Sequence, residues 1–290
     1  MKVRAVGGFI TAAVIAVWFM VPVRTAAQAS SQIGRTRGAQ ADAMIKEAEA
    51  KPTPRGPDGH PDLNGFWNYT QLPKSTHVDA EGNVHIADYL KIPVTLQPRR
   101  ADPNAPPYKP ELLAKVKYLG EHEVDEDPAF HCFPLGIPRA GSPRQIVQTP
   151  KLLVFLYQID AGIGDQPGSY RLVPTDGRKH RSDVDPSYFG DSIGHWEGDT
   201  LVVDVNQFND QTWLAGGDDG SGYFHSDALH VVEHFTRKGN TLHWEATAED
   251  PQVLTKPWQV TPETLVLADD MVYEQPVCEE REAKHIVDRY

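Results

Sequence analysis

Short runs of apolar or alternating apolar and polar residues fill the C-terminal half of the chain, and such runs are typical of β-strands. They cover residues 152–159, 170–173, 192–206, 230–249, 258–260, 264–267 and 271–277. Two segments, 39–50 and 110–119, have the pattern of short helices, and in the second Leu112, Leu113, Val116 and Leu119 form one apolar face. Many short strands with few helices predict a mainly β fold, in which an antiparallel sheet closes into a barrel or folds as a sandwich.

Two strand pairs share the same turn chemistry, because Gly198-Asp199-Thr200-Leu201 and Gly239-Asn240-Thr241-Leu242 differ only by Asp or Asn at the second position. A glycine at the first central position is typical of a type II′ turn, and a two-residue turn fixes the register of its hairpin. This register pairs Trp196 with Leu201 and Phe235 with Trp244. We expect the face that carries these residues to point inward, together with Ser192, Gly194, Val203, Val205, Val231, Glu233, Arg237, Leu242, Ala246 and Ala248.

Glu233 is the unusual member of this inward set, because its neighbours on that face are apolar or aromatic. A carboxylate in such surroundings is costly to ionise unless it is paired. One hypothesis is a structural ion pair or hydrogen-bonded network, for instance with Arg237 or Arg171. A second is an acid/base group with a raised pKa that lines a cavity. A bulge that shifts the register is the third interpretation.

The histidines His225, His230 and His234 resemble a metal-binding set, but their spacings of five and four residues do not match a known helical motif. The register places His230 and His234 on the outer face with His243 and Glu245, and His195 lies outside as well. We therefore predict no metal centre.

The candidate catalytic residues are Glu233 and three residues of loops that we expect at the mouth of the barrel: His225, His180 and Asp185. The candidate ligand-binding residues combine inward aromatic and polar positions with loop positions: Trp196, Trp244, Phe235, Tyr157, Ser192, Arg178, Asn209 and Trp213. A solvated or turn-forming role is the alternative for each loop residue, and simple core filling is the alternative for the rings.

Several types of chemistry lack a sequence signal. There is no Gly-x-Ser-x-Gly nucleophile elbow, no glycine-rich phosphate loop between a strand and a helix, and no calcium-loop spacing. We therefore expect no cofactor. An eight-stranded barrel leaves room for one small ligand, and tryptophan-lined walls suit flat or apolar molecules.

The composition of the 290-residue chain limits its partners and its compartment. The net charge of −12 disfavours nucleic acids and anionic membranes. Lys2 and Arg4 precede an apolar stretch at 5–23, and Ala27-Gln28-Ala29 follows it, which predicts a cleaved signal peptide at 1–29 and a periplasmic or secreted protein without stable membrane insertion. A membrane-anchoring helix is the alternative. A flexible lead-in at 30–60 and a single domain at 61–290 would follow.

The chain has two cysteines, Cys132 and Cys278. In an oxidising compartment an isolated pair most simply forms one disulfide, and we expect it to hold down a long loop at 121–144. A catalytic thiol is the minor alternative.

Five motifs of the chain form one larger pattern: Asp176-Gly177-Arg178-x-His180, Gly190-Asp191-Ser192-Ile193-Gly194-x-Trp196-Glu197-Gly198-Asp199-Thr200-Leu201-Val202-Val203-Asp204, Phe208-Asn209-x-x-Thr212-Trp213, Leu229-His230-Val231-Val232-Glu233 and Thr255-Lys256-Pro257-Trp258. In these motifs the chain resembles a large family of uncharacterised exported bacterial proteins. The resemblance extends from about Asp62 to Glu280 and implies a lipocalin-like barrel, and Gly65-Phe66-Trp67 is similar to the Gly-x-Trp start of lipocalins. It implies no reaction. His234 stands where the family often has arginine.

Three hypotheses for the function follow. The first is a cofactor-free acid/base enzyme of isomerase, lyase or hydratase type acting on a small hydrophobic or aromatic compound, and it predicts a pocket where Glu233 meets a second titratable group. The second is a non-catalytic carrier of such a ligand, with an apolar pocket. The third is a structural envelope protein with a filled interior.

Overall fold

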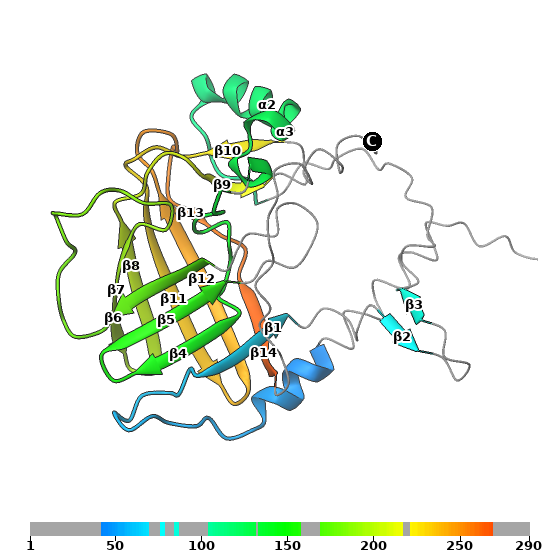
Figure 1. Cartoon of the computed structure of the whole chain (residues 1–290), viewed down its shortest axis with the longest axis vertical. Coiled ribbons are helices and arrows are strands. Elements are labelled where there is room, and N and C mark those ends of the chain that lie inside the picture. Colours follow the sequence, from blue (N-terminus) through cyan, green and yellow to red (C-terminus); the bar gives the residue numbers. More distant parts are fainter. Residues whose placement is uncertain are drawn as a thin grey trace, which may run out of the picture. The chain divides into compact units, whose positions relative to one another are not determined.

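The computed structural model describes residues 42–69, 76–78, 84–86, 104–131, 133–157, 169–216 and 221–268. Within these residues one antiparallel sheet dominates, with nine strands in the order β6-β5-β4-β1-β14-β12-β11-β8-β7 and with β13 paired to β12 (Figure 1). These strands are β1 (Gly65–Tyr69), β4 (Gln145–Thr149), β5 (Leu152–Tyr157), β6 (Ser169–Pro174), β7 (Asp191–Glu197), β8 (Thr200–Asn206), β11 (His230–Lys238), β12 (Thr241–Glu249), β13 (Trp258–Gln259) and β14 (Glu263–Ala268). The prediction of a mainly β, antiparallel barrel is confirmed.

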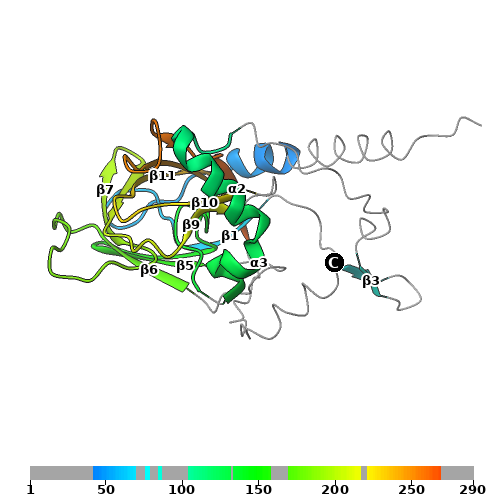
Figure 2. The same cartoon turned by 90° about the horizontal axis from the view of Figure 1, so that it is seen from above.

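The end strands of the sheet, β6 and β7, approach each other and nearly close the barrel. A Cβ atom on Gly194 of β7 would lie 2.9 Å from Cγ1 of Val173 on β6, so a glycine is what allows the two strands to come so near. Figure 2 shows the barrel end-on, with β11 on one side and β5 and β6 on the other.

Both predicted hairpins have the expected register. Trp196 pairs with Leu201 in the β7–β8 hairpin, and Phe235 pairs with Trp244 in the β11–β12 hairpin. The first central glycines, Gly198 and Gly239, have φ angles of 62° and 57°, in the left-handed region that a type II′ turn requires there. The inward face of β11 and β12 is buried along its whole length, as predicted.

Residues 48–53 are attached to the tip of the second hairpin. Residues 42–49 form a helix, and the Ala48 carbonyl oxygen accepts a hydrogen bond from the Asn240 amide at 2.9 Å. The Thr53 hydroxyl accepts from the Gly239 amide at 2.7 Å. The described part of the segment that we expected to be a flexible lead-in is therefore held against the barrel.

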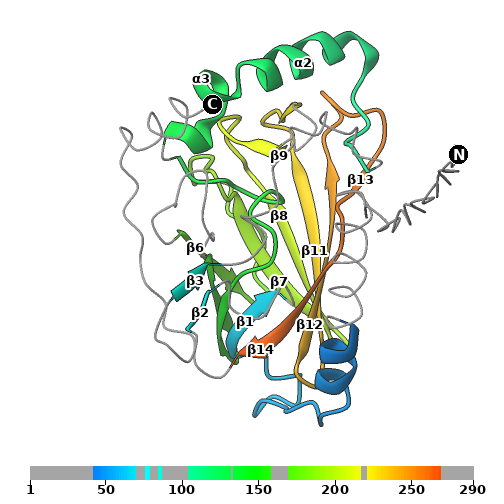
Figure 3. The same cartoon turned by 90° about the vertical axis from the view of Figure 1, so that its right-hand side faces the viewer.

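One end of the barrel carries a small helical layer (Figures 1 and 3). It contains η2 (Pro110–Leu112), α2 (Leu113–Glu121), α3 (Glu123–Glu126) and η3 (Pro128–His131), beside a two-stranded sheet of β9 (Trp213–Gly216) and β10 (Gly222–Phe224). A Cβ on Gly222 would clash with Leu119, so this glycine lets α2 pack directly on β10. The expected helix at 110–119 is present. The prediction of a simple loop at 121–144 is wrong, because this segment contains α3 and η3.

A further two-stranded sheet consists of β2 (Thr76–Val78) and β3 (Val84–Ile86). The strand expected at 271–277 lies outside the described residues, and so do Cys132 and Cys278. No helix in the described ranges has the length and apolar character needed to cross a membrane.

Candidate functional site

Glu233 lies inside the barrel and is completely enclosed. Its Oε2 atom is 2.6 Å from Nη2 of Arg171 on β6, and its Oε1 atom accepts a hydrogen bond of 3.0 Å from Nε1 of Trp244. Arg237 instead donates to the backbone carbonyl oxygens of Gly239 and Asp62. The structure therefore contains the ion pair that was one of our hypotheses, with Arg171 as the partner.

The surroundings of Arg171 complete a buried polar cluster. Nη1 of Arg171 donates to Oγ of Ser192 at 3.4 Å, and the guanidinium carbon lies 5.3 Å from the ring centre of Phe155 and 5.6 Å from that of Tyr157. Burial alone would lower the pKa of Arg171, but the Glu233 carboxylate and the Tyr157 phenol raise it. Burial also raises the pKa of Tyr157, so its hydroxyl stays protonated.

This cluster is suited to holding two opposite sides of the barrel together. An enclosed charge is tolerated when a partner compensates it, and removing one partner leaves the other uncompensated. An acid/base role for Glu233 would require it to gain and lose a proton while Arg171 stays beside it. The contacts of Glu233 therefore favour structural pairing over proton transfer.

His225 is buried at the start of the connection from β10 to β11. Its Nδ1 atom lies 2.9 Å from the Ser226 carbonyl oxygen, and its Nε2 atom lies 2.7 Å from Oγ1 of Thr212. The carbonyl can only accept, so Nδ1 donates to it, and Nε2 accepts from the threonine hydroxyl. Burial lowers the pKa of His225, which favours this neutral form. Both ring nitrogens are used for holding the loop.

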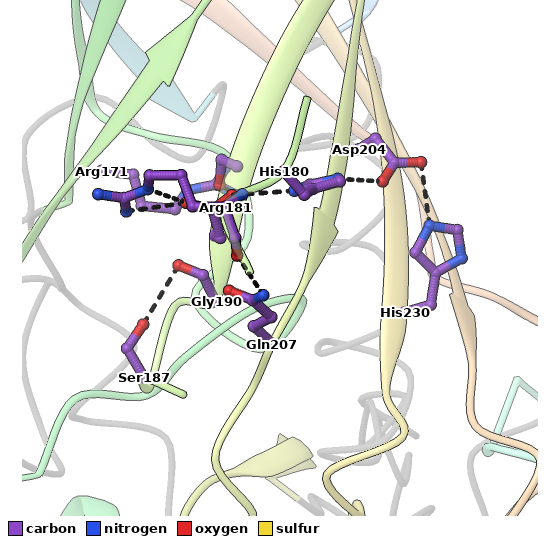
Figure 4. Close-up of polar contacts among 10 residues, drawn as sticks. Arg171, His180, Arg181, Ser187, Gly190, Asp204, Gln207 and His230 are labelled. Carbon is purple, nitrogen blue, oxygen red and sulfur yellow. Dashed lines mark hydrogen bonds and ion pairs between the residues drawn. The ribbon is translucent and has the colours of Figure 1, made fainter. Parts of the chain in front are cut away.

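His180 lies on the outer face of the sheet, between two carboxylates. Its Nδ1 atom is 3.0 Å from Oδ2 of Asp191 and its Nε2 atom is 2.7 Å from Oδ1 of Asp204. The other oxygen of Asp204 is 3.0 Å from Nε2 of His230, so one carboxylate links the two imidazoles (Figure 4). Asp191 and Asp204 occupy outward positions, since Ser192 and Val203 beside them point inward.

Hydrogen bonds from neighbouring side chains lower the pKa of both Asp191 and Asp204. Burial alone would raise the pKa of Asp191, but hydrogen bonds from His180 and Arg181 outweigh it and leave the pKa below its ordinary value. The same balance, with His180 and His230 as donors, lowers the pKa of Asp204. This cluster fastens the loop that carries His180 and Arg181 to strands β7 and β8.

The four candidate catalytic residues are not brought together. Glu233 lies inside the barrel, His180 lies outside it, His225 is occupied in a loop, and Asp185 is exposed. A sheet separates Glu233 from His180, so the two cannot act on one small substrate. Within the described ranges, no three His, Cys, Asp or Glu side chains are grouped so that they could hold a metal ion.

The candidate ligand-binding residues also divide into separate places. Phe235, Trp244, Tyr157 and Ser192 are buried in the barrel. Trp196 is only partly buried, because it lies next to the turn of the β7–β8 hairpin. Its ring stacks on His60 with ring centres 4.6 Å apart.

The loop residues of that set make local contacts. Arg178 pairs with Asp176 at 2.6 Å, and Oδ1 of Asn209 accepts from the Gln211 amide at 3.3 Å. Trp213 is buried beneath Arg139, whose guanidinium carbon lies 5.6 Å from the ring centre. The turn-forming alternative describes Arg178 and Asn209 well.

A pocket of about 470 Å³ lies between α2, β10 and the segment before η2. Its lining residues are Ala105, Pro106, Tyr108, Leu113, Val116, Lys117, Gly120, Glu121, Ser221 and Tyr223. Tyr108 and Tyr223 stack with ring centres 5.8 Å apart and planes inclined by 22°. The Tyr108 hydroxyl donates to the Phe224 carbonyl oxygen, and burial raises its pKa, so it remains a donor.

Both charged side chains of the pocket belong to α2. Nζ of Lys117 lies 3.6 Å from Oε1 of Glu121, and both side chains are mostly exposed. They lie one helical turn apart, so they share a face of the helix and offset each other's charge. The pocket is therefore apolar and aromatic in its buried part, with a neutral pair of charges among its exposed lining.

Sequence reasoning missed this pocket, because its two tyrosines lie far apart in the chain and in segments without a motif. One sequence signal could have indicated the pocket, namely the apolar face of the helix predicted at 110–119. It included Leu113 and Val116 but had no assigned partner, and both residues line the pocket.

The chain matches no protein-family model, no curated protein and no solved structure. The resemblance to a family of exported bacterial proteins, and the lipocalin-like character that it implies, therefore stay predictions.

Proposed function

We propose that this protein binds a small, mostly apolar aromatic molecule in the pocket beneath α2 and that it acts as a carrier or binding protein. The observation that carries the proposal is the pocket itself. A volume of about 470 Å³ falls within the range of ligand sites, roughly 300–1,000 Å³. Its walls combine aromatic and aliphatic side chains with a few polar groups, which is the usual composition of such sites.

The lining residues also indicate the chemical class of the ligand. The stacked rings of Tyr108 and Tyr223 offer flat surfaces for another aromatic ring. Lys117 and Glu121 offset each other, and the net charge of −12 disfavours anions in general. A neutral aromatic molecule fits best.

Binding without catalysis is favoured by the positions of the candidate acid/base groups. None of Glu233, His225, His180 and Asp185 lines the pocket. Glu233 is occupied by Arg171 and Trp244. The acid/base enzyme expected first from the sequence therefore has less support than the carrier, and the pocket favours the carrier over a purely structural envelope protein.

Fluorescence titration with N-phenyl-1-naphthylamine, an uncharged aromatic probe, tests this proposal. Leu113→Trp adds bulk to the pocket wall from an exposed position, and we expect it to weaken probe binding at least tenfold. Tyr118→Trp is the matched control, because Tyr118 is a similarly exposed residue of α2 that does not line the pocket. Equal affinities of the two variants, or no probe binding by the wild type, would contradict the proposal.

Export and a disulfide belong to the same proposal, and both rest on the sequence. The leader at 1–29 supports transfer to the periplasm or the medium, where a Cys132–Cys278 bond would form. Intact-mass measurement of the secreted protein, before and after reduction and alkylation, tests both. A chain that retains residues 1–29, or that alkylates without prior reduction, would contradict them.

A further inference from the structure

The outward face of β4, β5 and β6 is apolar over three adjacent strands. The register places Val147 opposite Val154, and Val154 opposite Leu172. A second row pairs Leu156 with Tyr170. The nine outward positions are Gln145, Val147, Thr149, Leu152, Val154, Leu156, Tyr170, Leu172 and Pro174, none of which is charged. This face is turned toward the reader in Figure 1.

The face is exposed to an unusual degree for apolar side chains. Tyr170 is 63% exposed, Leu172 51% and Val147 40%. By contrast, the outward positions of β8, β11 and β12 carry charged and polar groups, among them Asp204, Glu245 and Glu249. Contiguous apolar patches of several hundred Å² on a protein surface mark interaction sites.

We propose that the β4–β5–β6 face forms a weak, symmetric dimer with the same face of a second copy of this chain. Two antiparallel sheets pack face to face at about 10 Å through apolar side chains, and an isologous contact needs one self-complementary patch. The absence of charge on this face supports a second copy as the partner. Two copies of this acidic chain repel one another, and a face without charged side chains adds least to that repulsion.

The size of the face indicates how strong the contact is. Neighbouring strands are about 4.8 Å apart and outward residues of one strand are about 7 Å apart, so nine positions cover roughly 300 Å². Phe66 and Asn68 on β1, with Val266 and Ala268 on β14, continue the face and bring it to roughly 400 Å². Two copies would bury about 800 Å², below the standard size of about 1,600 Å². We therefore expect a dimer that forms reversibly at micromolar or higher concentration.

Sedimentation velocity of the purified secreted protein, from about 1 to 200 µM, tests the dimer. We expect the sedimentation coefficient to rise with concentration, and Leu172→Glu or Tyr170→Glu to weaken self-association at least tenfold, because each would place like charges opposite each other. Met44→Glu is the control, since Met44 is 50% exposed, lies outside this face and adds the same charge. Urea unfolding of each variant shows whether it folds.

The possible outcomes separate this partner from others. Loss of self-association in both face variants, with retention in Met44→Glu, supports the dimer. A wild type that is monomeric up to 200 µM overturns it. If the wild type is monomeric and Leu172→Glu also lowers the free energy of unfolding, another segment of the same chain covers the face. Equal weakening by all three variants would also overturn the proposal, because it would reflect net charge alone.

Discussion

Nη2 of Arg171 lies 2.6 Å from Oε2 of Glu233 in the interior of the barrel, and both side chains are at least 98% enclosed. Arg171 belongs to β6, at one end of the sheet order, and Glu233 belongs to β11, near the other end. The ion pair therefore spans the barrel close to the place where it closes. In this position the ion pair contributes to the stability of the barrel. Glu233 therefore lies inside the barrel and not in the lining of the pocket under α2.

Replacing Glu233 with glutamine should destabilise the fold by about 3–5 kcal/mol, because Arg171 would remain buried without a compensating charge. Urea unfolding followed by circular dichroism measures this change. Glu245→Gln, on the exposed side of β12, should change the unfolding free energy by less than about 0.5 kcal/mol. A Glu233→Gln variant as stable as the wild type would show that the pair contributes little.

The double variant Arg171→Met, Glu233→Leu should be more stable than either single variant. It removes both charges at once, and apolar side chains of similar volume can replace a buried ion pair at little cost. The same unfolding experiment measures the coupling between the two sites. Additive effects of the two substitutions would mean that the charges do not compensate each other.

The two hairpin glycines should differ in their response to alanine. Both have positive φ, so alanine costs roughly 1–2 kcal/mol at either position. Only at Gly239 would the added Cβ also clash with backbone carbonyl oxygens, including that of Ala48, whereas nothing lies within 4 Å at Gly198. Gly239→Ala should therefore lower the midpoint of thermal unfolding further than Gly198→Ala. Equal midpoints would mean that residues 48–51 are not held against this turn.

Acid should remove the contribution of Asp191 to stability. The pKa of this carboxyl is lower in the folded chain than its ordinary value, because hydrogen bonds from His180 and Arg181 outweigh its burial. The stabilisation is therefore complete above the unfolded pKa of about 3.9 and is lost as the pH falls through the lower folded value.

Unfolding free energies of the wild type and of Asp191→Asn, measured from pH 6 to pH 2, test this dependence. The difference between the two proteins should be present at pH 5 and should shrink below about pH 4. A difference that does not change over this range would show that Asp191 is not held ionised by its partners.

The orientation of the sheet could be predicted from the sequence because local turn chemistry determines it. Gly198 and Gly239 set the register of two hairpins, and the register decides that Glu233, Phe235 and Trp244 point inward. A compensating partner for Glu233 could be expected from its apolar neighbours, and Arg171 and Arg237 could be named as examples. Which of the two it is depends on how β6 returns to β7, and that is a property of the closed barrel rather than of any segment.

The pocket and the outer cluster could not be predicted in the same way. Tyr108 and Tyr223 stack although they lie far apart in the chain, and neither segment has a periodic pattern that indicates the other. His180 was assigned to the mouth of the barrel because it lies in a loop, but that loop folds back along the outside and places it between Asp191 and Asp204. Contacts between a loop and a distant strand leave no short-range signal in the sequence.

The most direct test of the central claim, that ligand binds under α2 and not at Glu233, compares the affinity of N-phenyl-1-naphthylamine in Leu113→Trp and Glu233→Gln, expressed per folded molecule. The structure leads us to expect at least a tenfold loss of affinity in Leu113→Trp and an unchanged affinity in Glu233→Gln. Unchanged binding in Leu113→Trp together with a loss in Glu233→Gln would place the ligand inside the barrel and contradict the account.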